Sequence, residues 1–150
     1  MIYCILIILV FAVEIFVKDY IEHHQLYGKE KTVCKGKINI TKIYNKGGCL
    51  NFMEKKDKLV RYVSTSMLAV LVVHFIALLS KKGNRTMKFS LACIIGGALS
   101  NICDRLFKGY VVDYLVFNVK KLKNVVFNIG DLFIFLGSII LTIHSIFRKK

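Results

Sequence analysis

The stretch GGALSNICDRLFKGYVVDYLVF, residues 96–117, and the segment FNIGD, residues 127–131, decide how this chain is interpreted. Each contains a carboxylate in apolar surroundings. Asp113 lies inside a short apolar string, and Asp131 is the sole acid in the apolar run from Val125 to Phe147. Inserting an acid into a hydrophobic span costs about 2.5 kcal/mol or more, so such residues are usually retained for function. Both aspartates are therefore candidate functional residues.

The composition around these segments indicates an integral membrane protein. Of the 150 residues 55% are hydrophobic, none is proline, and the formal net charge is +14. Apolar blocks of membrane length alternate with basic connectors, which is typical of a multi-span membrane protein. We therefore interpret the positive charge as contact with lipid headgroups, and we expect no nucleic-acid partner. The length suffices for a single membrane domain, residues 1–150.

The hydropathy pattern predicts a mainly α-helical protein with four transmembrane helices, at about residues 1–18, 62–80, 86–104 and 125–147. A small β-cradle is expected between the first two helices, at about residues 30–58, because residues 37–44 are rich in β-branched side chains. The segment 111–117 is too short to span and is expected to lie at the membrane interface or against the helices.

Four spans would place both chain ends on one side of the membrane and connectors 18–61 and 104–124 on the other. The polar candidates that fall on this second side are Asn45, Asn101, Arg105, Asp113, Asn128 and Asp131. Spacings of three and four residues put Asn128 on a helix face with Asp131, and Asn101 on one with Arg105. In the first span, Glu14 and Lys18 have the spacing of an ion pair.

Two facing aspartates would support acid–base chemistry. Like charges at short range resist joint ionisation, so the pair would share one proton. One carboxylate would activate a water, and the other would polarise a carbonyl and protonate the leaving amine, as in aspartic proteases. The residues alone leave other interpretations open: Asp113 paired with Arg105, ion- or proton-coupled transport, a channel subunit, or a membrane scaffold.

Metal and redox motifs are missing from the sequence. It has five cysteines but no CxxC pair, and His23-His24 do not form HExxH. We therefore expect no metal and no cofactor. Cys34 and Cys49 share one connector, and a disulfide between them stays open because the sequence does not supply the geometry.

The chain resembles the lipoprotein signal peptidases (signal peptidase II), intramembrane aspartyl endopeptidases of bacteria, over essentially its whole length. Residues 96–117 are similar to the family's paired glycines, Asn, Asp-Arg and Val-Val-Asp-Phe, and residues 127–131 to its Phe-Asn-x-Ala-Asp. The resemblance implies that Asp113 and Asp131 are the catalytic dyad. It implies a supporting or substrate-binding role for Asn45, Gly47, Asn101, Arg105, Asn128, Glu14 and Lys18.

The same resemblance implies a substrate and a location. Family members cleave diacylglyceryl-modified prolipoproteins just before the lipidated cysteine, and globomycin, a cyclic peptide, inhibits them. We expect a monomer in the bacterial cytoplasmic membrane, in contact with lipid, with both termini cytoplasmic and the active site near the extracytoplasmic face. A count of Lys and Arg gives 16 in the two outer connectors (11 and 5) and 7 inside (4 and 3), which by itself favours the reverse orientation.

The chain also departs from the family pattern. The first span usually carries Asp four residues before Lys, where this chain has Glu14. The family's Asn-x-Gly motif, which matches Asn45-Lys46-Gly47, usually continues with Ala and Phe, whereas here Gly48, Cys49 and Leu50 follow. Ser100 stands where the family usually has Gly, and Gly130 where it usually has Ala.

Overall fold

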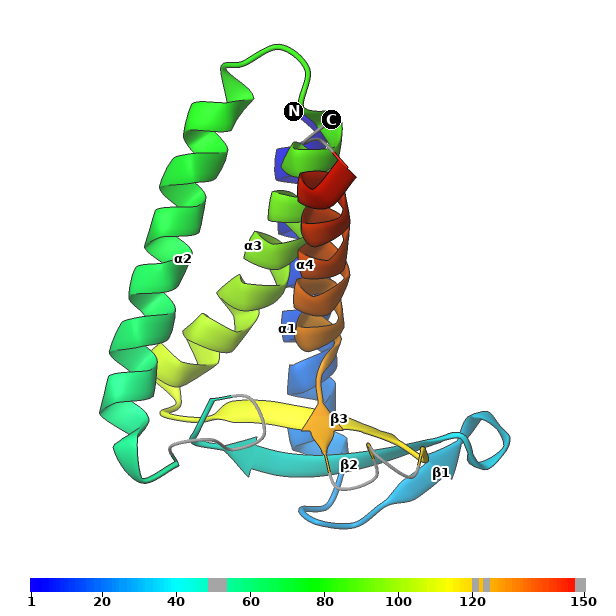
Figure 1. The fold of residues 1–150 in the computed structure, drawn as a ribbon. Coiled ribbons are helices and arrows are strands. Elements are labelled where there is room, and N and C mark those ends of the chain that lie inside the picture. The colour runs from blue at the N-terminus through cyan, green and yellow to red at the C-terminus, as the bar shows by residue number, and fades with distance from the viewer. Residues whose placement is uncertain (49–53, 120–121, 123–124, 148–150) are drawn as a thin grey trace.

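The computed structural model describes residues 1–48, 54–119, 122 and 125–147 as four long helices and a small sheet. The helices are α1 (Ile2–His24), α2 (Asp57–Leu79), α3 (Arg85–Phe107) and α4 (Ile129–Phe147). The strands are β1 (Lys31–Val33), β2 (Ile38–Asn45), β3 (Val111–Phe117) and β4 (Val126–Phe127), with 3-10 turns at Cys34–Gly36 and Glu54–Lys56. Figure 1 shows the sheet crossing one end of the helices, whereas α1 begins and α4 ends at the other end.

Helix α3 is the centre of the helical part and packs against the other three helices. Small residues make this possible, because they allow two helix backbones to approach closely. A Cβ added at Gly97 would collide with the backbone oxygen of Gly130 in α4, and one added at Gly137 would lie 2.5 Å from the Ser90 backbone oxygen. One at Gly96 would lie 3.0 Å from Val10 in α1. These glycines therefore allow α3 to approach α1 and α4 closely.

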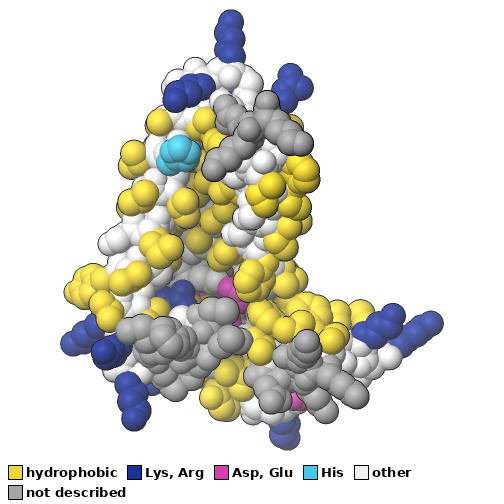
Figure 2. All heavy atoms as spheres, viewed as in Figure 1, with side chains coloured by type: hydrophobic (Ala, Val, Ile, Leu, Met, Phe, Trp, Pro, Cys, Tyr) yellow, Lys and Arg dark blue, Asp and Glu magenta, His cyan; other side chains and the backbone are white. Residues whose placement is uncertain are grey.

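Three of the described helices, α2, α3 and α4, are long and apolar enough to cross a membrane. Helix α1 is as long as α2, about 34 Å at 1.5 Å per residue, but it carries Glu14, Lys18 and Asp19. Figure 2 shows apolar side chains over the helical part and Lys and Arg side chains towards its ends. A mainly helical membrane protein with a small sheet is confirmed, and the fourth transmembrane helix stays a prediction.

The sheet is antiparallel with strand order β1-β2-β3-β4, and its strands come from two distant connectors. The predicted strand in 37–44 is confirmed as β2, which pairs with β3 so that Tyr44 lies opposite Val112. The expectation of a cradle made by the first connector alone is therefore incomplete. Residues 111–117, expected at the interface or against the helices, form an inner strand, because their apolar residues other than Leu115 are β-branched or aromatic and the segment pairs with β2.

The last helix begins at Ile129, although the fourth span was expected from Val125. Val126 and Phe127 are held instead as β4 by pairing with β3. Asp131 consequently lies in the first turn of α4, and not six residues inside a helix.

A buried ion cluster joins α1 to α3. The Lys18 ammonium nitrogen lies 2.9 Å from an Asp104 oxygen and 3.7 Å from a Glu14 oxygen. It also donates hydrogen bonds to Ser100 Oγ at 3.0 Å and Asn101 Oδ1 at 2.7 Å. The side chains of the ion pairs are at most 2% exposed, so each needs its partner in order to stay buried. The expected pair of Glu14 and Lys18 thus forms as part of a larger cluster.

We predict that Lys18→Met destabilises the protein by about 3–5 kcal/mol, because it leaves the buried Glu14 carboxylate without a cation and removes the closer of the two cations that pair with Asp104. Lys108→Met is the control, since Lys108 also pairs with Asp104 but is 34% exposed, and its loss should cost about 1 kcal/mol or less. Thermal unfolding of the purified variants in detergent measures both effects. Equal losses for the two variants would contradict this account.

Candidate active site

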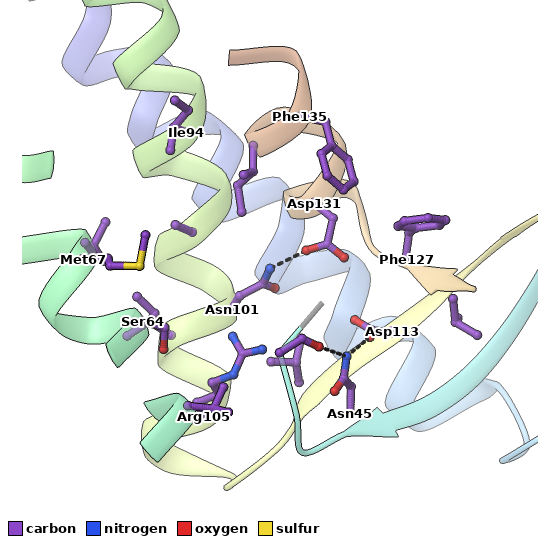
Figure 3. A pocket seen from close by; sticks show the side chains of 18 of the residues that line it. Asn45, Ser64, Met67, Ile94, Asn101, Arg105, Asp113, Phe127, Asp131 and Phe135 are labelled. Carbon is purple, nitrogen blue, oxygen red and sulfur yellow. Dashed lines mark hydrogen bonds between the residues drawn. The ribbon is translucent and has the colours of Figure 1, made fainter. Parts of the chain in front are cut away.

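A cavity of about 390 Å³ opens between the helices and the sheet. Its wall is largely apolar and is built by α2, α3, α4 and β3, with residues such as Met67, Leu71, Ile94, Ala98 and Phe135. Its polar side chains include Asn45, Asn101, Arg105, Asp113 and Asp131, which Figure 3 shows gathered at one part of the wall. The cavity therefore combines an apolar surface with one polar centre.

Asp113 reaches this cavity because successive residues of a strand point to opposite faces of the sheet. Val111 and Asp113 line the cavity, whereas Val112 and Tyr114 pack in a cluster with Ile21 of α1. The Asp113 carboxylate is 3% exposed and accepts hydrogen bonds from Asn45 Nδ2 at 2.9 Å and Asn128 Nδ2 at 2.7 Å. Two neutral amide donors thus hold the carboxylate in place.

Asp131 is held by a reciprocal pair of hydrogen bonds at the start of α4. Its backbone N–H donates to Asn128 Oδ1 at 2.9 Å, and its carboxylate accepts from the Asn128 backbone N–H at 3.2 Å. This is the pattern of a capping box, which satisfies two orphan N–H groups of a helix start. The positive end of the helix dipole also favours a carboxylate at this position.

Asn128 consequently connects the two aspartates. Its side-chain oxygen and backbone bind Asp131, while its side-chain nitrogen binds Asp113. The Asn128 side chain is fully buried, so water does not compete for its two side-chain hydrogen bonds. The two carboxylates, whose approach the sequence left open, are connected at the wall of one cavity by a single asparagine.

The environment of Asp113 favours its protonated form. Burial, and after it the negative charge of Asp131, raise the pKa of this carboxyl to about 7, against the lowering effect of the Asn45 and Asn128 donors. A carboxyl group with this pKa can hold a proton at neutral pH and give it to a substrate atom.

Two residues of α3 complete the polar centre. Asn101 Nδ2 donates to Asp131 Oδ1 at 2.8 Å, while its Oδ1 accepts from Lys18. Arg105 donates to the Gly47 backbone oxygen at 2.9 Å, and its Nε has no hydrogen-bond partner among the described residues. Gly47 in turn donates its N–H to Asn45 Oδ1 at 2.9 Å. These two hydrogen bonds of Gly47 hold the turn after β2 next to Asn45, which itself binds Asp113.

Glu14 and Lys18 lie behind the cavity, outside its lining. Lys18 is linked to the site by its hydrogen bond to Asn101, and Glu14 accepts a hydrogen bond at 2.9 Å from Tyr114, the neighbour of Asp113 on β3. Tyr114 is a residue that the sequence analysis missed. Its signal was a hydroxyl directly beside Asp113 in an otherwise apolar string.

Within the described ranges, no three His, Cys, Asp or Glu side chains are grouped so that they could hold a metal ion. The pairing of Cys34 with Cys49 lies outside the described residues, as do the positions Cys49 and Leu50 of the Asn-x-Gly segment.

Comparisons with known proteins agree on one family. A family model described as signal peptidase (SPase) II matches residues 6–147. A lipoprotein signal peptidase of Francisella tularensis subsp. novicida (strain U112) is 31% identical over 151 residues, which cover 99% of this chain and 93% of that protein. One of Clostridium tetani (strain Massachusetts / E88) is 34% identical over 120 residues, covering 79% and 76%.

The fold is also that of two solved structures described as a bacterial membrane enzyme. One has a TM-score of 0.85 at 21% identity, and the match covers 99% of this chain and 89% of the solved chain. The other has a TM-score of 0.80 at 22% identity, and the match covers 95% of this chain and 91% of the solved chain. Because the family model matches residues 6–147 and a relative is 31% identical over 99% of this chain, the chain belongs to the signal peptidase II family of membrane proteases.

Proposed function

We propose that this protein removes the signal peptide from diacylglyceryl-modified prolipoproteins by cleaving just before the lipidated cysteine. The observation that carries the proposal is the joint attachment of Asp113 and Asp131 to Asn128 at the wall of a largely apolar cavity. Family membership and the name of the relatives, lipoprotein signal peptidase, supply the substrate class. The apolar wall suits a substrate that is a hydrophobic peptide carrying a lipid.

The proposed chemistry uses two aspartates and one water. Asp113 holds the shared proton, because burial keeps its pKa near neutrality, and Asp131 acts as the general base. Asp131 takes a proton from water while the oxygen attacks the scissile carbonyl, which Asp113 polarises by hydrogen bonding. The proton taken by Asp131 then passes to the leaving amine as the C–N bond breaks, so the enzyme returns to its starting state.

The surrounding polar residues would orient the reactants. Asn45, Asn101 and Asn128 hold the carboxylates, and the Arg105 guanidinium can donate to a backbone oxygen of the substrate through its remaining N–H groups. Together with α1, the helices would make four membrane crossings, with both termini cytoplasmic and the sheet at the extracytoplasmic surface. The substrate would enter sideways from the lipid, and globomycin-like peptides would compete for the cavity.

One prediction of the proposed function concerns the two aspartates. Asp113→Asn and Asp131→Asn should each lower kcat by about 10²- to 10⁴-fold or more, because each removes a proton-transfer group and keeps the side-chain size. The assay is cleavage of a diacylglyceryl-modified prolipoprotein by purified protein, with and without globomycin, and thermal unfolding shows that the variants are folded.

Asp19→Asn is the matched control, because Asp19 is an exposed aspartate of α1 with no contact to the cavity, and it should keep wild-type activity. A wild-type protein that does not cleave, or a folded dyad variant with full activity, would overturn the proposal.

Another prediction concerns the pH dependence of cleavage. Activity should fall as the pH rises through about 7, because Asp113 then loses the shared proton. In Asn45→Ala the carboxylate loses a donor that lowers its pKa, so the proton is retained to higher pH. The alkaline limb of kcat/KM should therefore shift upward, measured from about pH 5 to 9.

Asn39→Ala serves as the comparison, since Asn39 lies on the same strand but is bonded to Glu30 and Asn118 and not to Asp113. Its alkaline limb should coincide with that of the wild type. A limb that stays in place or moves to lower pH in Asn45→Ala would contradict the assignment of the proton to Asp113.

A further inference from the structure

Two buried residues behind the cavity, Glu14 and Tyr114, contact the first turn of α4, and the mechanism above does not use them. Tyr114 is 1% exposed and Glu14 is fully buried. The Tyr114 hydroxyl donates to Glu14 Oε2 at 2.9 Å and accepts from the Ile129 backbone N–H at 3.2 Å. One hydroxyl thus connects α1, β3 and α4 directly behind the aspartates.

Glu14 also acts on this turn without the tyrosine. Its carboxylate interacts with the backbone amide of Gly130, the residue before Asp131. The first N–H groups of a helix have no partner within the helix and must be satisfied from outside. Here the N–H of Ile129 binds Tyr114, that of Gly130 interacts with Glu14, and that of Asp131 binds Asn128. Tyr114 therefore binds one of the three amides at the start of α4 by a hydrogen bond, and the Glu14 carboxylate acts electrostatically on a second.

We propose that Glu14 and Tyr114 form one positioning unit that fixes the first turn of α4, and with it Asp131, relative to Asp113. The unit does so because Tyr114 follows Asp113 directly on β3, while its hydroxyl binds the residue two before Asp131 on α4. This inference rests on the proposed function, since its main readout is peptide cleavage.

The two residues also fit each other as a pair. The Tyr114 hydroxyl has its only donor bond to Glu14 among the described residues, and within the same part of the chain that Glu14 oxygen accepts no other hydrogen bond from α3 or β3. Burial raises the pKa of the Tyr114 hydroxyl, so it keeps its proton and remains a donor to Glu14.

The expected effect falls on catalysis and not on substrate binding. Neither Glu14 nor Tyr114 lines the cavity, so a substrate does not touch them. A shift of the α4 start would, however, displace Asp131 from its partner, and small displacements of reacting groups can cost about 10²-fold in rate.

The test is Tyr114→Phe, which removes one oxygen and keeps the buried ring. We expect kcat in prolipoprotein cleavage to fall about 10- to 100-fold while KM stays within about 2-fold. The matched control is Tyr110→Phe, since Tyr110 also donates to a glutamate of α1, Glu22, at 3.3 Å but is hydrogen-bonded to no residue of α4 in the described part of the chain. This control should keep the wild-type kcat.

A second variant shows whether the two residues act as a unit. Glu14→Asp withdraws the carboxylate by one methylene and should also lower kcat at constant KM. In the double variant Glu14→Asp/Tyr114→Phe, the loss should be smaller than the product of the two single losses, because both changes break the hydrogen bond between Tyr114 and Glu14. Losses that multiply would show two independent residues and overturn the unit.

Hydrogen exchange separates this inference from the proposed function. In Tyr114→Phe the amides at the start of α4 should exchange faster, whereas they should stay protected in Tyr110→Phe. If Tyr114→Phe does not fold, Glu14→Asp carries the same two measurements. Inert wild-type protein would defeat the proposed function alone, and unchanged exchange together with unchanged kcat in folded variants would defeat the positioning unit.

Discussion

The reciprocal hydrogen bonds between Asn128 and Asp131 are the interaction on which the site depends. A helix that begins at the buried wall of a largely apolar cavity must have its first N–H groups satisfied, since an unpaired buried polar group is costly. The capping pair meets this need and uses one functional carboxylate to do so. The spare nitrogen of Asn128 then binds Asp113, so helix capping and the alignment of the two aspartates are the same structural event.

A second constraint orients the asparagines. The side chain of Asn101 has a donor end and an acceptor end, and Lys18 donates to its oxygen. Its nitrogen must therefore face the cavity, where it donates to Asp131. The buried ion cluster between α1 and α3 thus stabilises the helix pair and sets the direction of a hydrogen bond at the site, although Lys18 itself never reaches the cavity.

The sheet brings together the remaining parts. Strand β2 delivers Asn45 and the turn at Gly47, and β3 delivers Asp113, although the paired strands are separated by the whole of α2 and α3. Because side chains alternate along β3, Asp113 points into the cavity and Tyr114 points towards α1. One face of the strand therefore contributes an aspartate to the site, and the other contributes the tyrosine behind it.

The sequence by itself determined the membrane class, the helical segments, the strand within 37–44 and the two aspartates as candidates, because composition, apolar run length and residue type are local properties. It missed the strand character of 111–117, the start of α4 at Ile129 and the place of Tyr114. Each of these depends on partners far away in the chain: β3 on β2, Val126 and Phe127 on β3, and the Tyr114 hydroxyl on Glu14 and Ile129. A strand or a buried hydroxyl is stable only where its hydrogen bonds are completed, and tertiary structure alone decides which residues complete them.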